Sequence, residues 1–194
     1  VAGNQALLEE RAAVREAYRE LTATAGGWVV PVAVRVPLAA WHFRDARAAV
    51  EAAGRTWELT GETDATLAGV DARHGPAAEA WARATTLAEL DAAADLADRQ
   101  LRAARDVADA HAMLGSPLDV AQQVGLFGTR VPSVDAAIPA VRAGDGDAVA
   151  RITADIRSTV AGLRAAGQQR MVAGGSAALV LLAILAVLLV RRAR

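Results

Sequence analysis

The chain has 194 residues, enough for one or two domains, and its 21 basic and 22 acidic side chains nearly cancel to a net charge of −1. This balance argues against a nucleic-acid partner, which would favour a basic face. The absence of Cys excludes disulfides and thiolate metal sites within the chain. The sequence is rich in Ala, the strongest helix former, and only 4% of its residues are aromatic. We therefore expect an all-α protein with closely packed helices.

The first predicted helix covers residues 5–24. Leu7, Val14 and Leu21 recur every seven residues, so they share one face of this helix. The Gly pair that begins at Gly26 is typical of a helix end. This pattern predicts an amphipathic helix that packs along one side.

The next segment, residues 28–36, permits two interpretations. Its Val residues alternate with other residues from Val32 to Val36, as in a strand. Pro31 and Pro37 instead favour a bent connector, because proline lacks the amide hydrogen that a regular strand or helix uses. We predict a connector.

A second helix is predicted for residues 37–59. Phe43, Ala46, Val50 and Ala53 have the spacing of one helix face. This pattern resembles the second helix of a tetratricopeptide-type repeat, although the chain has no repeat period of about 34 residues. The resemblance implies only that small residues let paired helices approach closely.

The longest predicted helix runs from residue 76 to residue 114, after a polar loop at residues 60–75. Two apolar stripes along it imply neighbours on two sides, as in a helical bundle. We expect an Ala-rich antiparallel bundle. The first stripe consists of Leu87, Leu90, Ala94, Ala97, Leu101, Ala104 and Ala108, and the second of Leu96, Ala103, Val107, Ala110 and Leu114.

Residues 115–117, Gly-Ser-Pro, break this helix, and a loop with a short helix follows. The Gly-Asp-Gly-Asp sequence at residues 144–147 predicts a hairpin turn with an Asp helix cap. No Pro follows it, so we expect the last helix to continue toward the C-terminus, with soft points at Gly167 and Gly174.

The last part of the chain predicts one transmembrane helix. Residues 171–190 carry no charge and span about 30 Å as a helix, the thickness of a bilayer core. Arg191, Arg192 and Arg194 follow directly, and the positive-inside rule places them in the cytoplasm and the N-terminal part outside. The alternative orientation is a tail anchor that faces the cytosol. A buried helix without a membrane would need apolar neighbours on every side.

Gly174 and Ala178 form a pair of small residues spaced by one helical turn. Such a pair can let two transmembrane helices approach closely. Alternatively, it marks a flexible entry into the membrane helix.

The chain lacks the phosphate-binding, nucleophile-elbow, dinucleotide and zinc-protease motifs. We therefore predict no catalytic, cofactor-binding or metal-binding residues and no cofactor. Asp91, Asp95 and Asp98 share a helix face but alternate with Arg, which favours a solvated salt-bridge face over a cation site. The remaining candidates are the His residues, predicted to be surface or cap residues, and the Trp residues, predicted to fill an Ala-built core rather than line a sugar or peptide groove. These are His42, His74, His111, Trp28, Trp41, Trp57 and Trp81.

These observations predict an extracytoplasmic bundle over residues 1–166, a membrane helix with its entry segment at 167–190 and a cytoplasmic tail at 191–194. This layout is similar to the membrane-proximal helical region of large actinobacterial-type surface proteins. Because the sequence starts at Val1 without a signal peptide, we expect an export signal or a larger domain upstream.

The expected function is a membrane-anchored scaffold, stalk or interaction module that displays an upstream domain outside the cytoplasmic membrane. The expected partners are the lipid bilayer and either another membrane protein or that upstream domain. One alternative is a ligand-binding or sensing ectodomain that works with a membrane partner. A second alternative is the C-terminal part of an extracellular enzyme, such as a peptidase, whose active site lies upstream.

Overall fold

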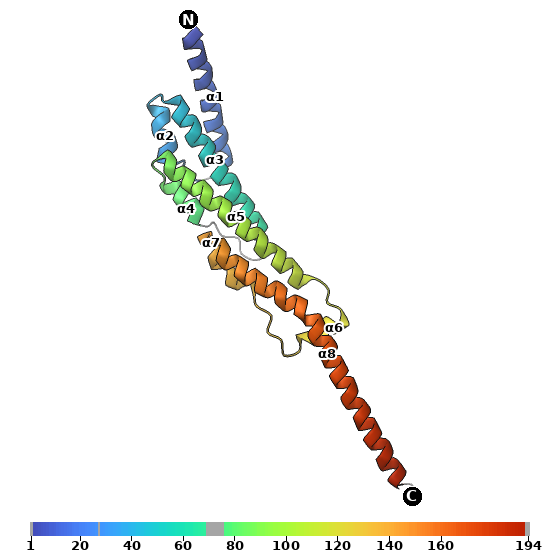
Figure 1. Cartoon of the computed structure of the whole chain (residues 1–194). Coiled ribbons are helices and arrows are strands. Elements are labelled where there is room, and N and C mark those ends of the chain that lie inside the picture. Colours follow the sequence, from blue (N-terminus) through green and yellow to red (C-terminus); the bar gives the residue numbers. More distant parts are fainter. Residues whose placement is uncertain (1, 27, 69–75, 193–194) are drawn as a thin grey trace. The chain divides into compact units, whose positions relative to one another are not determined.

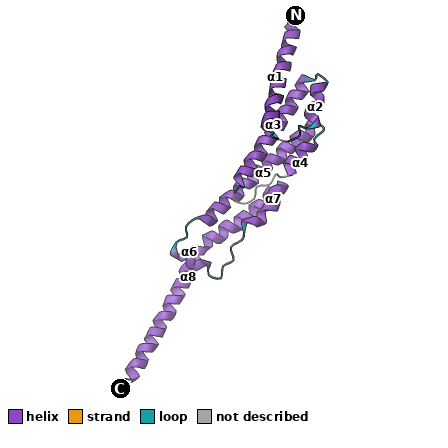
Figure 2. Ribbon diagram, turned by 180° about the vertical axis from the view of Figure 1, so that it is seen from behind, coloured by secondary structure: helices purple, strands orange, loops and turns teal. Residues whose placement is uncertain are grey.

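The computed structural model describes residues 2–26, 28–68 and 76–192, with side chains for residues 4–26, 28–68 and 76–175. Every regular element in these residues is helical, which confirms the all-α prediction (Figures 1 and 2). The elements are α1 (Ala2–Thr24), α2 (Val32–Ala39), α3 (Phe43–Thr66), α4 (Pro76–Arg83), α5 (Leu87–Gly115), α6 (Val120–Leu126), a 3₁₀ turn (Val134–Ala137), α7 (Ile138–Ala143) and α8 (Gly146–Arg192).

The chain forms two compact units, and each unit is built from two separate stretches of the sequence. Unit 1 comprises Val1–Ala108 and Ala137–Ala150, and unit 2 comprises Asp109–Ala136 and Arg151–Arg194. Helices α5 and α8 therefore contribute residues to both units. The predicted boundaries at residues 166 and 190 concern the two sides of a membrane, and they stay predictions.

Helices α1 and α3 of unit 1 run in the same direction. Val14 of α1 packs in one apolar cluster with Phe43 at the start of α3. Leu21, seven residues further along α1, belongs to a second cluster with Val50, seven residues further along α3. Because both positions advance together, the two helices are parallel, as Figure 1 also shows.

Helices α3 and α5 are parallel as well. Arg55 of α3 pairs with Asp95 of α5 at 3.4 Å, and Glu62 of α3 pairs with Arg105 of α5 at 3.1 Å. The prediction of an antiparallel bundle was therefore wrong for these long helices. The short helix α2 lies between α1 and α3, and α4 lies between α3 and α5, so no two consecutive long helices are joined by a tight turn that would make them antiparallel.

Helix α2 occupies part of the segment that we predicted to be a connector. Pro31 precedes its first residue with a φ of −59°, which suits entry into a helix. Ala33 and Val34 are buried on one side of α2, and this apolar contact stabilises the helix beyond what the sequence indicates. A turn with Trp41 at a φ of +62° follows, so α3 begins at Phe43 rather than at residue 37.

The predicted single helix at residues 76–114 is divided into α4 and α5. Thr86 Oγ1 accepts a hydrogen bond from the Glu89 backbone N–H at 3.2 Å, while Glu89 Oε2 accepts from the Thr86 backbone N–H at 3.1 Å. These reciprocal bonds form a capping box, which satisfies amide groups at the start of α5. The Thr85 backbone N–H and hydroxyl also donate to Glu89, and these bonds lower the pKa of its carboxyl group.

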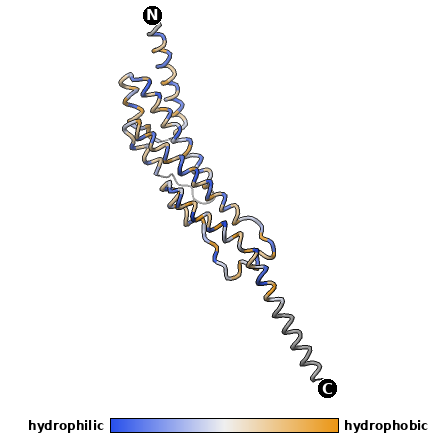
Figure 3. Tube along the Cα trace, viewed as in Figure 1, coloured by the Kyte–Doolittle hydropathy of each residue, from blue (hydrophilic) through white to orange (hydrophobic). Residues whose placement is uncertain are grey.

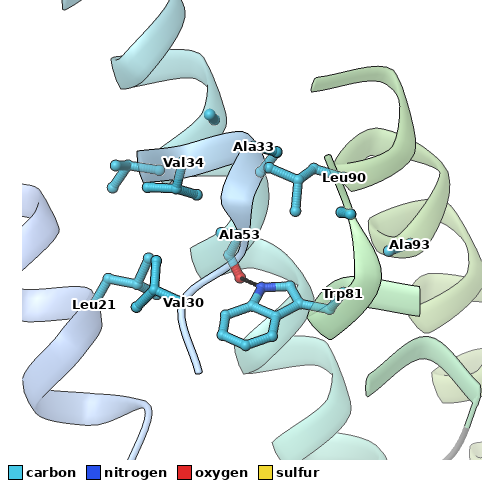
Figure 4. Close-up of a cluster of buried hydrophobic side chains, with 12 residues drawn as sticks. Leu21, Val30, Ala33, Val34, Ala53, Trp81, Leu90 and Ala93 are labelled. Atoms are coloured by element: carbon cyan, nitrogen blue, oxygen red, sulfur yellow. Dashed lines mark hydrogen bonds between the residues drawn. The ribbon is translucent and has the colours of Figure 1, made fainter. Parts of the chain in front are cut away.

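The core of unit 1 is built from small residues around one buried Trp (Figure 4). Trp81 is fully buried on α4, and its indole Nε1 donates a hydrogen bond to the Ala53 carbonyl oxygen of α3 at 3.0 Å. Ala side chains form much of the surrounding cluster, which confirms the expected Ala-rich packing. The labelled neighbours in Figure 4 are Leu21, Val30, Ala33, Val34, Leu90 and Ala93.

Helix α3 extends to Thr66, beyond its predicted end at residue 59. Three buried Thr residues lie in the second half of α3: Thr56 before the predicted end, and Thr60 and Thr63 beyond it. Each hydroxyl donates to the backbone carbonyl four residues earlier, at 2.8–2.9 Å, which satisfies the buried polar groups within the helix. Of the predicted loop at 60–75, residues 69–75 lie outside the described part of the chain.

The predicted hairpin at residues 144–147 is confirmed. Gly144 ends α7 in the left-handed conformation with a φ of +67°. Asp145 Oδ1 accepts a hydrogen bond from the Ala148 backbone N–H at 2.9 Å and so caps the start of α8, as the sequence predicted. The buried Gln100 of α5 donates through Nε2 to the Arg142 carbonyl oxygen at 2.5 Å, which joins α7 to α5.

Helix α8 is unbroken over 47 residues, from Gly146 to Arg192. In the part of the chain that the structure describes, no helix is both long and apolar enough to cross a membrane. The predicted membrane segment at residues 171–190 lies largely outside the residues with described side chains, which end at residue 175. Figure 3 shows hydrophilic and hydrophobic positions alternating along the helices of unit 1, as expected for amphipathic elements.

Candidate functional site

The short helix α6 lies directly against the middle of α8 within unit 2. Gly125 and Gly167 form the contact. A Cβ atom at Gly125 would overlap the Leu163 carbonyl oxygen, and one at Gly167 would overlap the Ala121 carbonyl oxygen. Only glycine permits this approach of two backbones. Gly167 is thus a packing residue rather than the soft point that we predicted.

Charged side chains of α8 hold both ends of α6. At its start, Asp119 forms a capping box with Gln122 and pairs with Arg164 of α8 at 3.1 Å. At its end, Arg170 donates to the carbonyl oxygens of Gly125 at 2.6 Å and Val124 at 3.2 Å. A cation at the C-terminus of a helix stabilises the free carbonyl groups there. We call α6, its neighbouring residues 127–130 and the α8 segment 163–172 the α6–α8 junction.

The α6–α8 junction exposes several large apolar side chains. Phe127, directly after α6, is 77% exposed, and Val172 on α8 is 70% exposed. Such exposure of a Phe beside other apolar side chains is typical of an interaction surface. Three further exposed apolar side chains of the junction are Val120, Leu126 and Met171.

The α6–α8 junction was not predicted from the sequence. The Asp119-x-x-Gln122 spacing is a sequence signal for a helix start, and the short helix predicted after residues 115–117 is present as α6. The contact with α8 has no such signal, because Gly125 and Gly167 are 42 positions apart and only the folded chain brings them together.

The residues predicted to set membrane topology lie at the end of α8. Arg191 and Arg192 are its last two residues, and Arg194 lies outside the described part of the chain. Gly174 is exposed, and a Cβ there would meet no atom within 4 Å, so its face is open to a neighbour. The side chain of Ala178 lies outside the described residues, so the helix-packing role of this pair stays a prediction.

The four Trp residues divide into two groups. Trp28 contacts Trp57 and Trp81 edge to face, with ring centroids 4.5 and 4.8 Å apart. Trp81 is fully buried in the core as predicted, whereas Trp28 and Trp57 are half-buried beside it. Trp41 differs, since it is 62% exposed and the guanidinium of Arg11 lies 4.6 Å from its ring centroid. This is a cation–π contact at a surface.

Trp41 also borders a groove of about 280 Å³ between the first turns of α1 and the start of α3. Its other lining residues include Leu7 and Leu8, which are exposed, and Phe43. The left-handed backbone of Trp41 is unusual for a bulky residue and turns this side chain outward at the groove. Among the residues whose side chains the structure describes, those that line the groove are mainly apolar and include no carboxylate or His.

The acidic and His candidates do not converge in the described residues, where no group of three or more His, Asp or Glu side chains is placed to hold a metal ion. Asp98 pairs with Arg102 on the same helix and Asp95 pairs with Arg55 of α3, in line with the predicted salt-bridge face. His42 directly precedes α3 and His111 lies on α5, both exposed, while His74 lies outside the described part.

Comparison with protein-family models, curated proteins and solved structures finds no match to this chain. The features that bear on function are the α6–α8 junction and the uncharged sequence that follows it. The contacts of the α6–α8 junction hold α6 against α8 immediately before the uncharged segment that begins at Met171, and exposed apolar side chains occur in the same part of unit 2.

Proposed function

We propose that this chain is a membrane-anchored helical scaffold that displays an upstream domain or a partner outside the cytoplasmic membrane. The observation that carries the proposal is the continuity of α8, which passes from the α6–α8 junction to Arg192 without interruption. Its residues 171–190 are uncharged, and this length matches a bilayer core of about 30 Å. A single helix would thus join the folded part and the membrane anchor.

The α6–α8 junction supports the scaffold role. In a scaffold, the membrane anchor sets the position of the folded part of the chain. The helix that joins the folded part to the anchor should therefore be held by firm contacts. The close backbone contacts at Gly125 and Gly167 and the two Arg contacts from α8 provide such a hold. The Arg residues after position 190 then favour an orientation with the body outside.

Membrane anchoring is tested by extraction of the full-length protein from membranes with alkaline carbonate. We expect the native protein to stay in the membrane fraction and a variant without residues 171–194 to be released. A matched control keeps the length of the chain: Leu182→Arg introduces one charge near the centre of the segment and should weaken insertion. Release of the native protein by carbonate would refute the anchor.

Orientation is tested with single Cys residues, which the Cys-free sequence makes possible. Gly61 is exposed, and a Cβ there meets no atom within 4 Å, so Gly61→Cys should fold normally. We expect an impermeant thiol reagent to label it in intact cells, whereas Ala193→Cys should react only after lysis. The reverse labelling pattern would favour a tail anchor that faces the cytosol.

A further inference from the structure

We infer that the α6–α8 junction is a second, peripheral membrane contact, in which Phe127 and Leu126 insert into the lipid interface beside the point where α8 enters the bilayer. This inference rests on the proposed membrane anchor and deepens it. The partner is the lipid bilayer itself, at the level between headgroups and acyl chains.

Phe127, directly after α6, lies close to the level of Arg170 on α8. The guanidinium of Arg170 contacts the carbonyl oxygen of Gly125, so the end of α6 lies at the level of residue 170. The uncharged segment begins with the next residue, Met171. Phe127 follows Gly125 by two residues and is 77% exposed, which places its ring beside the predicted membrane boundary.

The side chains around Phe127 suit a lipid interface. Met171 and Val172 of α8 are exposed at the same level, so apolar side chains from two segments occur together. Arg130 is exposed three residues after Phe127, and Arg170 lies at the boundary itself. Apolar side chains with neighbouring Arg residues are the usual composition of segments that lie in a membrane interface.

The rigidity of the junction makes this exposure persistent. The backbones of α6 and α8 already touch at Gly125 and Gly167, so α6 cannot move closer to α8. Phe127 therefore cannot become buried against α8 by such a movement. Thr129 Oγ1 donates to the Gly125 carbonyl oxygen at 2.7 Å, which also orders the chain after Phe127. A held, exposed Phe at the membrane boundary would set the tilt of α8 and keep the body in one orientation.

The test uses spin labels on single Cys residues in the full-length protein, reconstituted in vesicles of phosphatidylcholine with a minor share of phosphatidylglycerol. The labelled positions are Phe127→Cys and, as a second reporter, Leu126→Cys. Two controls lie equally far from Arg170 along α8, about 18 Å at 1.5 Å per residue: Ser158→Cys on the exposed side of the body and Leu182→Cys in the uncharged segment. The accessibility of each label is then measured separately to oxygen, which partitions into lipid, and to a nickel chelate, which stays in water.

We expect the ratio of oxygen to chelate accessibility at residues 126 and 127 to exceed that at residue 158 severalfold, and to remain below that at residue 182. If residue 182 is in lipid while residues 126 and 127 behave like residue 158, the anchor stands and the peripheral contact is refuted. Labels at 126 and 127 that are shielded from both reagents would indicate a protein cover and would also overturn the inference. If residue 182 is itself in water, the membrane anchor fails, and the peripheral contact fails with it.

Discussion

The indole Nε1 of Trp81 donates a hydrogen bond to the backbone carbonyl oxygen of Ala53, a residue of another helix, at 3.0 Å. Both residues are fully buried. A buried indole N–H without a partner would cost free energy, so this bond fixes how α4 docks on α3. The largest side chain of the core is thereby oriented by a single polar contact.

Replacing Trp81 with Phe should destabilise unit 1 by about 2 kcal/mol, because the variant loses the hydrogen bond and leaves a cavity. Urea unfolding followed by circular dichroism measures this loss. Trp41→Phe is the matched control, since Trp41 is 62% exposed, and we expect it to change the free energy of unfolding by less than about 1 kcal/mol. Equal losses in the two variants would contradict the assigned role of Trp81.

Overpacking should reveal how closely the helices approach α5. Ala97 and Ala104 are fully buried, so Ala97→Leu or Ala104→Leu should destabilise unit 1 by about 1–3 kcal/mol. Ala92→Leu, at an exposed position of the same helix, should change stability by less than about 0.5 kcal/mol. Trp fluorescence during unfolding reports on unit 1 specifically, because all four Trp residues belong to it. Tolerance of Leu at position 97 would mean that the bundle is loose.

The start of α5 should depend on pH through Glu89. Hydrogen bonds from Thr85 and Thr86 lower the pKa of this carboxyl group below its ordinary value of 4.5. A group whose pKa is lowered by folding adds stability above its unfolded-state pKa, and that contribution disappears as the pH falls through the folded-state pKa. Glu89→Gln should therefore lower the melting temperature at neutral pH, with the difference from the native protein shrinking in acid.

The same capping box should behave as one unit. Since Thr86 and Glu89 bond to each other's backbone amides, the combined loss in Thr86→Ala/Glu89→Gln should be smaller than the sum of the two single losses. A double-mutant cycle of melting temperatures at neutral pH tests this. Strictly additive losses would indicate that the two residues act independently at the helix start.

Replacing Gly167 and Gly162 of α8 should have opposite effects, because only Gly167 lies in the contact with α6. Gly167→Ala would place a Cβ on the Ala121 carbonyl oxygen, so it should detach α6 and accelerate amide hydrogen exchange there by about tenfold or more. Gly162→Ala lies on the same helix, where a Cβ meets no atom within 4 Å, and should stabilise α8 by about 0.4–1 kcal/mol. Unchanged exchange in α6 of Gly167→Ala would show that the contact is absent in solution.

The sequence predicted the helical class and several local features because these depend on neighbouring residues. The Asp145 cap and the break after α5 are examples. The sequence also has a signal for the break between α4 and α5, because Thr86 and Glu89 have the spacing of a capping box. The apolar pattern continues on both sides of this position and obscured the signal.

Other features depend on contacts between distant residues and could not be predicted in this way. The parallel course of α3 and α5 is visible only from pairs such as Arg55 with Asp95. The short helix α2 forms because Ala33 and Val34 are buried in the apolar core of unit 1, although Pro31 and Pro37 indicated a connector. The glycine contacts of the α6–α8 junction likewise arise only after folding.

The division of unit 1 into two stretches of sequence has a consequence for synthesis of the chain. Gln100 is 2% exposed and donates to the carbonyl oxygen of Arg142, which the ribosome adds later. Domains generally fold as units during translation, from the N-terminus onward. Here the buried amide of Gln100 obtains this partner only after α7 has been synthesised. Unit 1 therefore stays incomplete on the ribosome until residues 137–150 have emerged. Its maturation is thereby tied to nearly the same moment at which the hydrophobic C-terminal segment is made.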